Sequence, residues 1–128
     1  MTQILITGSN SGFGKLAALS LARKGHHVVA TMRNLSKGQD LLDLAEKEQL
    51  SLETKQLDVT NPESIALCIE HPEEIDVLIN NAGITRDGLL MRMSEQDWDD
   101  IMSVNLKSVF NLTKASLRTF LKQRNGSI

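Results

Sequence analysis

Short apolar runs rich in β-branched residues alternate along this chain with longer segments of helical periodicity. The runs predict strands at 3–7, 27–32, 52–58 and 76–80. Apolar residues spaced three or four positions apart predict helices between them, at about 13–24, 37–48 and 62–70. This alternation is typical of βαβ units, in which parallel strands are buried on both faces of the sheet. We therefore expect an α/β fold built on a doubly wound parallel sheet.

The remainder of the chain is predicted to be mostly helical. Ser94 and Asp97 have the spacing of a capping box and predict a helix that ends at about 103. An apolar stripe predicts a second, longer helix from about 105 to 122. Asn125-Gly126 ends this helix, and Ser127-Ile128 resembles the first step of a fifth strand. The 128 residues thus predict one domain, 1–128.

Charge and cysteine content argue against several functional classes. The 14 basic and 16 acidic residues are mixed along the chain, so we expect neither nucleic acid nor an anionic membrane as a partner. The single cysteine, Cys68, cannot form an intramolecular disulfide and fits a reducing compartment. There is no signal-peptide pattern, and no apolar run approaches about 18 residues. We expect a cytoplasmic protein, and no metal site.

The glycine-rich loop between the first strand and the first helix indicates phosphate binding. Gly8 allows a tight turn, while Gly12 and Gly14 let a pyrophosphate and the sheet approach the helix N-terminus. Free N–H groups and the helix dipole favour an anion there. A P-loop would instead need glycine at 9 and Ser or Thr at 16, where the chain has Ser9 and Leu16. For the glycines alone, an ordinary strand-to-helix turn is the remaining alternative.

Three other motifs lie in register with this loop, and together the four resemble the short-chain dehydrogenase/reductase family. They are Thr7-Gly8-x-x-x-Gly12-x-Gly14, Leu57-Asp58-Val59-Thr60, Asn80-Asn81-Ala82-Gly83 and Val104-Asn105. The resemblance spans the whole chain and implies a Rossmann-type sheet of strand order 3-2-1-4 and a nicotinamide dinucleotide cofactor. Residues 84–122 look most like 3-oxoacyl-carrier-protein reductases, and residues 1–35 more like hydroxysteroid and retinol dehydrogenases. The substrate therefore stays open here.

The resemblance also implies roles for individual residues. The cofactor-binding loop would consist of Gly8, Ser9, Asn10, Ser11, Gly12, Phe13 and Gly14. Asp58 would hydrogen-bond the adenine amino group, with Val59 packing nearby. The ribose on the nicotinamide side would contact Asn81, Ala82 and Gly83.

The end of the second predicted strand indicates which cofactor is preferred. A carboxylate there would bond the adenosine ribose and repel a 2′-phosphate, but the chain has Met32 followed by Arg33. Arginine can pair with a phosphate in bidentate geometry, and Ser11 is a plausible second donor. We therefore predict NADP(H) over NAD(H). The alternative for Arg33 is a solvent-facing loop residue.

The family's catalytic groups are a Tyr, a Lys four residues later, a Ser and an Asn. Only the Asn is matched, by Asn105, whose role would be to anchor a water of the proton relay. The Tyr-x-x-x-Lys motif would lie beyond Ile128, and the chain contains no Tyr. We therefore expect the nucleotide-binding portion of a dehydrogenase, inactive by itself. Only a supplied C-terminal half would let it act on a carbonyl or alcohol substrate.

Two alternatives remain open. One is a binding or self-assembling module that keeps the dinucleotide cradle and does no chemistry. The other is an engineered chimera of two dehydrogenase branches. In the family the long helix often forms a subunit interface, which implies a homo-oligomer.

Overall fold

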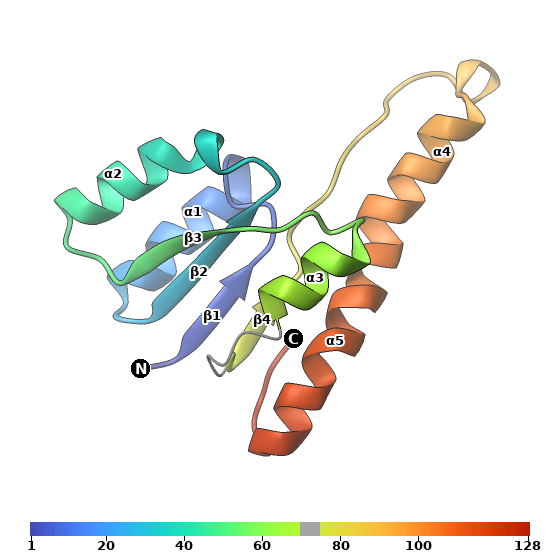
Figure 1. The fold of residues 1–128 in the computed structure, drawn as a ribbon. Helices are drawn as coiled ribbons and strands as arrows, with labels where there is room; N and C mark the ends of the chain where they lie inside the picture. The colour runs from blue at the N-terminus through green and yellow to red at the C-terminus, as the bar shows by residue number, and fades with distance from the viewer. Residues whose placement is uncertain (70–74) are drawn as a thin grey trace.

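The computed structural model describes residues 1–69 and 75–128 and contains a four-stranded parallel sheet (Figure 1). The strands are β1 (Gln3–Ile6), β2 (His27–Met32), β3 (Leu52–Gln56) and β4 (Val77–Ile79). Their order is β3-β2-β1-β4, which confirms the expected topology. In register, Ile4 lies beside Val28 on one side and Val77 on the other. All four strands end at the same edge, where ligands bind in open parallel sheets.

Three helices lie between the strands, close to their predicted ranges. They are α1 (Gly12–Arg23), α2 (Gln39–Lys47) and α3 (Pro62–Ile69). A short 3₁₀ turn, Leu35–Gly38, precedes α2, so the α-helix begins two residues later than predicted. Asn61 caps α3 by accepting from the N–H groups of Glu63 and Ser64. Position 70, the last of the predicted helix, lies outside the described residues.

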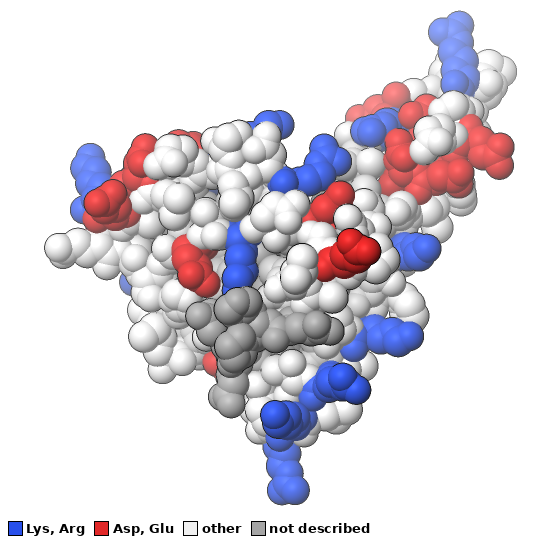
Figure 2. Space-filling model, in the orientation of Figure 1, with Lys and Arg blue, Asp and Glu red and all other residues white. Residues whose placement is uncertain are grey.

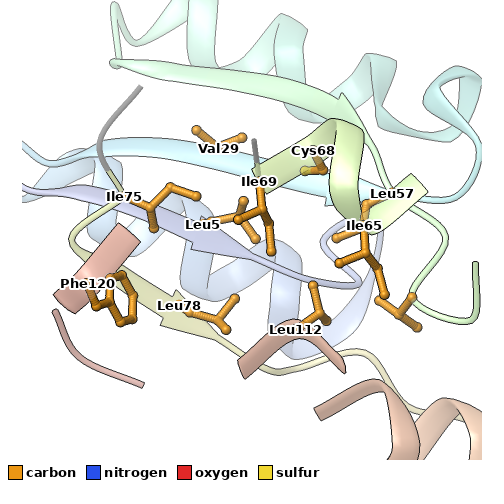
Figure 3. Packing of buried hydrophobic residues seen from close by; sticks show 11 residues of the cluster. Leu5, Val29, Leu57, Ile65, Cys68, Ile69, Ile75, Leu78, Leu112 and Phe120 are labelled. Carbon is orange, nitrogen blue, oxygen red and sulfur yellow. The ribbon is translucent and has the colours of Figure 1, made fainter. Parts of the chain in front are cut away.

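The two faces of the sheet are covered by different helices (Figure 1). Alternate residues of each strand point to opposite faces, so β1 sends Leu5 to one side and Ile4 and Ile6 to the other. Ile4 and Ile6 pack with apolar residues of β2, α1 and α2. Figure 3 shows the other cluster, in which Leu5 meets residues of α3, β4 and the C-terminal helix. β1 and β2 are thus buried on both faces, as predicted, whereas β3 at the edge of the sheet is only partly buried.

The C-terminal half contains one long helical rod rather than the two separate helices expected. A short 3₁₀ turn (η2, Leu90–Arg92) is followed by α4 (Glu95–Met102), a π segment (η3, Ser103–Lys107) and α5 (Ser108–Gln123). The capping box is confirmed, because Asp97 N–H donates to Ser94 Oγ at 3.0 Å and Ser94 N–H to Asp97 Oδ2 at 3.3 Å. The prediction of a break near 104 was wrong, because a π turn takes up the change of periodicity without ending the helix.

The end of the chain returns to the sheet. Ser127 forms a parallel bridge with Val77, which fits the expected first step of a fifth strand. Asp76 fastens this region, because its carboxylate accepts from the N–H of Gln3 at 2.9 Å and from Asn125 Nδ2 at 3.2 Å. Its carbonyl also accepts from the Ser127 N–H at 2.9 Å. One carboxylate therefore joins β1, β4 and the segment that follows α5. Among the described residues, no helix is long and apolar enough to span a membrane.

Candidate dinucleotide site

Buried hydroxyl groups tie the strands together at their carboxyl ends. Thr31 Oγ1 and Ser9 Oγ both donate to the carbonyl of Ile6, at 2.8 and 3.0 Å. The Ser9 N–H donates to the Thr31 carbonyl at 2.9 Å. Ser9, predicted to contact the cofactor, thus has its N–H and its hydroxyl engaged inside the protein. Ser9 therefore stabilises the conformation of the glycine loop through these internal hydrogen bonds.

Thr7 links the glycine loop to the end of β4. Its Oγ1 accepts from the N–H groups of Asn81 and Ala82, at 3.0 and 2.9 Å. In return, Asn81 Nδ2 donates to the carbonyls of Thr7 and Gly8, at 3.0 and 3.1 Å. The glycine loop and the segment after β4, far apart in sequence, are therefore hydrogen-bonded to each other. The role of Thr7 was missed by the sequence analysis, although a hydroxyl directly before Gly8 was a usable signal.

The three glycines of the loop are required for two different reasons. A Cβ on Gly14 would lie 2.2 Å from the Gly8 carbonyl oxygen and 2.5 Å from Asn81 Nδ2, so there is no room for a side chain. Gly12 has open space around it but a φ of +56°, which other residues rarely adopt. Gly8 combines both constraints, with a φ of +66° and only 2.9 Å to the Ala82 Cα. The loop therefore lies directly against 81–83.

The N-terminus of α1 offers hydrogen-bond donors at this loop. The first N–H groups of a helix, here from Gly12 to Gly14, have no intrahelical partner. Ser11 stands at the N-cap in an extended conformation, and its hydroxyl makes no capping bond to the described first turn. Asn10 is half-buried, Ser11 is exposed, and the Phe13 side chain is 86% exposed. This geometry fits a pyrophosphate, because N–H groups and the positive end of the helix dipole converge on one point.

Arg33 and Asp58 follow the neighbouring strands β2 and β3 at the same edge of the sheet. Asp58 Oδ1 accepts from the Thr60 hydroxyl at 2.7 Å and from the Thr60 N–H at 3.0 Å. The Thr60 hydroxyl is the main cause that lowers the pKa of Asp58, and the positive charge of Arg33 acts in the same direction. Asp58 is thus ionised at neutral pH and can accept from an amino group. Val59, predicted to pack nearby, is buried in the core cluster.

Met32 and Arg33 point in different directions. Met32 is 2% exposed and packs against Gly38, so it presents no side chain to a ribose. Arg33 is exposed and is the first residue after β2. A cation, and no carboxylate, therefore stands at the strand end where the adenosine ribose is expected.

Asn105 lies next to the end of β4, at the other side of the site. Its Oδ1 accepts from the Ile84 N–H, and its Nδ2 donates to the Ile84 carbonyl, both at 2.8 Å. A Cβ on Gly83 would lie 3.4 Å from Asn105 Oδ1. The predicted catalytic residue is therefore brought beside Gly83, and its side-chain oxygen and nitrogen each form a hydrogen bond with the Ile84 backbone.

Substitutions at Gly12 and Gly14 distinguish the two reasons why glycine is required, backbone conformation and lack of space. At Gly12, where φ is the constraint, we expect Gly12→Ala to cost about 1 kcal/mol and Gly12→Asn less, because Asn tolerates left-handed φ. At Gly14, where space is the constraint, Gly14→Ala should cost about 1–3 kcal/mol and the larger Gly14→Asn more. Urea denaturation of the four variants measures the order. The same order at both positions would contradict this account.

Comparison with known proteins agrees with this geometry. The family model for the short chain dehydrogenase matches residues 2–128. The 3-oxoacyl-[acyl-carrier-protein] reductase of Vibrio cholerae is 44% identical over 128 residues, covering 97% of this chain and 51% of the relative. The reductase of the same name from Escherichia coli is 41% identical with the same coverage. The similarity thus extends well beyond residues 84–122, and the chain spans about half the length of these relatives.

Solved structures show the same fold. A gluconate 5-dehydrogenase from Burkholderia cenocepacia, in complex with NADP and tartrate, superposes with a TM-score of 0.89 at 32% identity. That match covers 98% of this chain and 51% of the other. Sequence motifs, sheet order, glycine loop and family match all agree, and the chain belongs to the short-chain dehydrogenase family.

Proposed function

We propose that residues 1–128 form the NADP(H)-binding domain of a short-chain dehydrogenase. The observation that carries this proposal is the loop Gly8–Gly14, held against Asn81 and Ala82 by the Thr7 hydroxyl. The α1 N–H groups and Ser11 would hold the pyrophosphate, together with the rest of the loop. Asp58 and Val59 would take the adenine, and 81–83 would contact the ribose on the nicotinamide side. A cytoplasmic location belongs to the same proposal, supported by the free, buried thiol of Cys68.

The preference for NADP(H) rests on Arg33. Arg33 follows the buried Met32 at the end of β2, and its positive charge acts on Asp58. From there its guanidinium would pair with a 2′-phosphate on the adenosine. The NADP complex of the similar gluconate 5-dehydrogenase supports this choice. NAD(H) lacks that phosphate and gains nothing from the guanidinium.

Calorimetric titration tests the cofactor assignment. We expect the chain to bind NADPH more tightly than NADH, and Arg33→Ala to weaken NADPH binding about 10–100-fold, the worth of one charge-assisted pair. NADH affinity should not change, because it lacks the phosphate. Arg118→Ala, an exposed arginine on α5, serves as the control and should bind like the wild type. Equal affinities of the wild type for NADPH and NADH would refute the preference.

The chemistry of the complete protein would be hydride transfer to a carbonyl, with a 3-oxoacyl or hydroxysteroid-like group as the proposed substrate. A bound nicotinamide supplies the hydride, and the protein must supply a proton to the oxygen. Asn105 is the candidate within this chain, as the anchor of a relay water. The chain has no Tyr to act as the proton donor. We therefore propose that it binds cofactor without turnover. A module that only binds or assembles is the second candidate, favoured by the same lack of Tyr.

A turnover assay distinguishes the two candidates. The chain with NADPH and a 3-oxoacyl thioester should give no oxidation of NADPH above background, followed at 340 nm as an absorbance change. Adding a separately produced C-terminal half that carries Tyr-x-x-x-Lys should start NADPH oxidation if the chain is the cofactor half of a dehydrogenase. Turnover by the chain alone would show that the proton comes from a group not identified here.

We further propose that two copies associate through the exposed face of the long helix. A groove of about 660 Å³ runs along this face, with a floor formed by Met102, Leu106, Val109, Phe110 and Leu117. Charge is segregated along the rod, as Figure 2 shows, with acidic side chains on α4 and basic ones on α5. An antiparallel pair would bury both grooves and place the acidic α4 of one copy beside the basic α5 of the other.

A single charge in the groove tests this association. Phe110 is 62% exposed, and Phe110→Glu should convert a dimer into a monomer, because it replaces an apolar contact by a carboxylate that must be desolvated in the interface. Leu67, 77% exposed on α3, is the matched apolar position outside the groove, so Leu67→Glu should stay dimeric. Sedimentation velocity gives the masses. A monomeric wild type at every concentration would exclude the proposal.

A further inference from the structure

We propose that Ser108 is a positioning residue: its hydroxyl stabilises the π segment that lets Asn105 hold Ile84. The inference rests on the proposed function only in placing Ile84 beside the nicotinamide end of the site. The contacts themselves involve protein atoms alone. They can therefore be tested apart from cofactor binding.

One carbonyl of the π segment accepts a hydrogen bond from the Ser108 side chain. At the end of η3, the backbone N–H groups donate to the carbonyls of Ser103 and Leu106. The Val104 carbonyl, between them in sequence, accepts from the Ser108 hydroxyl. Ser108 is only 3% exposed, so water is poorly placed to replace that hydroxyl. Without that hydroxyl, the π turn would lose a hydrogen bond.

The π turn decides which way Asn105 points. A π turn holds one residue more than an α turn, and one residue corresponds to about 100° of rotation around the helix axis. If the segment relaxed to a regular α-helix, Asn105 would turn by about that angle relative to α5. It would then lose both of its 2.8 Å hydrogen bonds to Ile84. The hydroxyl of Ser108 therefore acts on Ile84 through Asn105.

Ser116 provides a matched comparison on the same helix. It is 1% exposed, and its hydroxyl has no hydrogen-bond partner within the described part of the chain. It lies in the regular part of α5, outside the π segment. Serine hydroxyls that bond the carbonyl four residues earlier often bend a helix. A comparison of Ser108 with Ser116 therefore separates loss of this hydrogen bond from truncation of a buried serine alone.

Amide hydrogen exchange of the full chain, followed by NMR, measures the effect directly. We expect Ser108→Ala to speed exchange of the Ile84 N–H at least tenfold relative to the Val28 N–H, which is bonded to the Ser51 carbonyl in the sheet. Ser116→Ala should leave that ratio unchanged, and Ser108→Thr, which keeps the hydroxyl, should stay near the wild type. An unchanged ratio in Ser108→Ala would overturn the proposal. So would Ser108→Thr exchanging as fast as Ser108→Ala, because packing would then be the cause.

A double-mutant cycle tests whether Ser108 acts through Asn105. Asn105→Ala removes the acceptor of the Ile84 N–H, so adding Ser108→Ala should produce no further change in its exchange. Additive effects of the two substitutions would contradict the proposed route. Titration of the same proteins with NADPH tests the proposed function separately from the role of Ser108. A wild type that fails to bind NADPH would refute the proposed function, while the exchange ratios would still decide the role of Ser108.

Discussion

The hydrogen bonds of the Thr7 side chain are the constraint on which the candidate site depends. The parallel β1–β4 pairing brings 7–14 beside 81–83, but strand pairing alone does not fix the loops beyond the strand ends. One buried hydroxyl accepts from two consecutive N–H groups, and the Asn81 amide returns two bonds to the glycine loop. Because these groups are enclosed, each missing bond would leave an unpaired polar atom. The proposed phosphate cradle is therefore held in place by contacts within the protein.

Much of the fold could be predicted because the strands and helices have distinct periodicities. Short apolar runs rich in β-branched residues predicted the four strands, and Ser94 marked a helix start that the structure confirms. The junction near Asn105 was mispredicted because a π turn keeps the chain helical, and its signature is one extra residue rather than a glycine or proline. Periodicity analysis treats such a shift of phase as a break between two helices.

The candidate site was predicted less completely than the fold, because the sequence motifs do not show which way each side chain points. The motifs located Gly8, Asp58 and Asn81, but not what their side chains bind. Ser9 points inward to Ile6, and Asn105 uses its amide on Ile84, contacts that join residues distant in sequence. Such contacts follow from the packing of strands and helices, which local spacing does not encode. The role of Thr7 was missed for the same reason, since its hydrogen-bond partners lie more than 70 positions away.

The connection through Asp76 has a consequence for the order of folding. Its bond to Gln3 joins residues 73 positions apart, whereas the pairings of β1 with β2 and β2 with β3 close shorter loops. Longer loops cost more entropy to close, so we expect the β1–β2–β3 half to assemble first and β4 to dock afterwards. The cradle is divided between these two parts. A nascent chain would therefore complete the proposed nucleotide-binding surface late, when β4 docks.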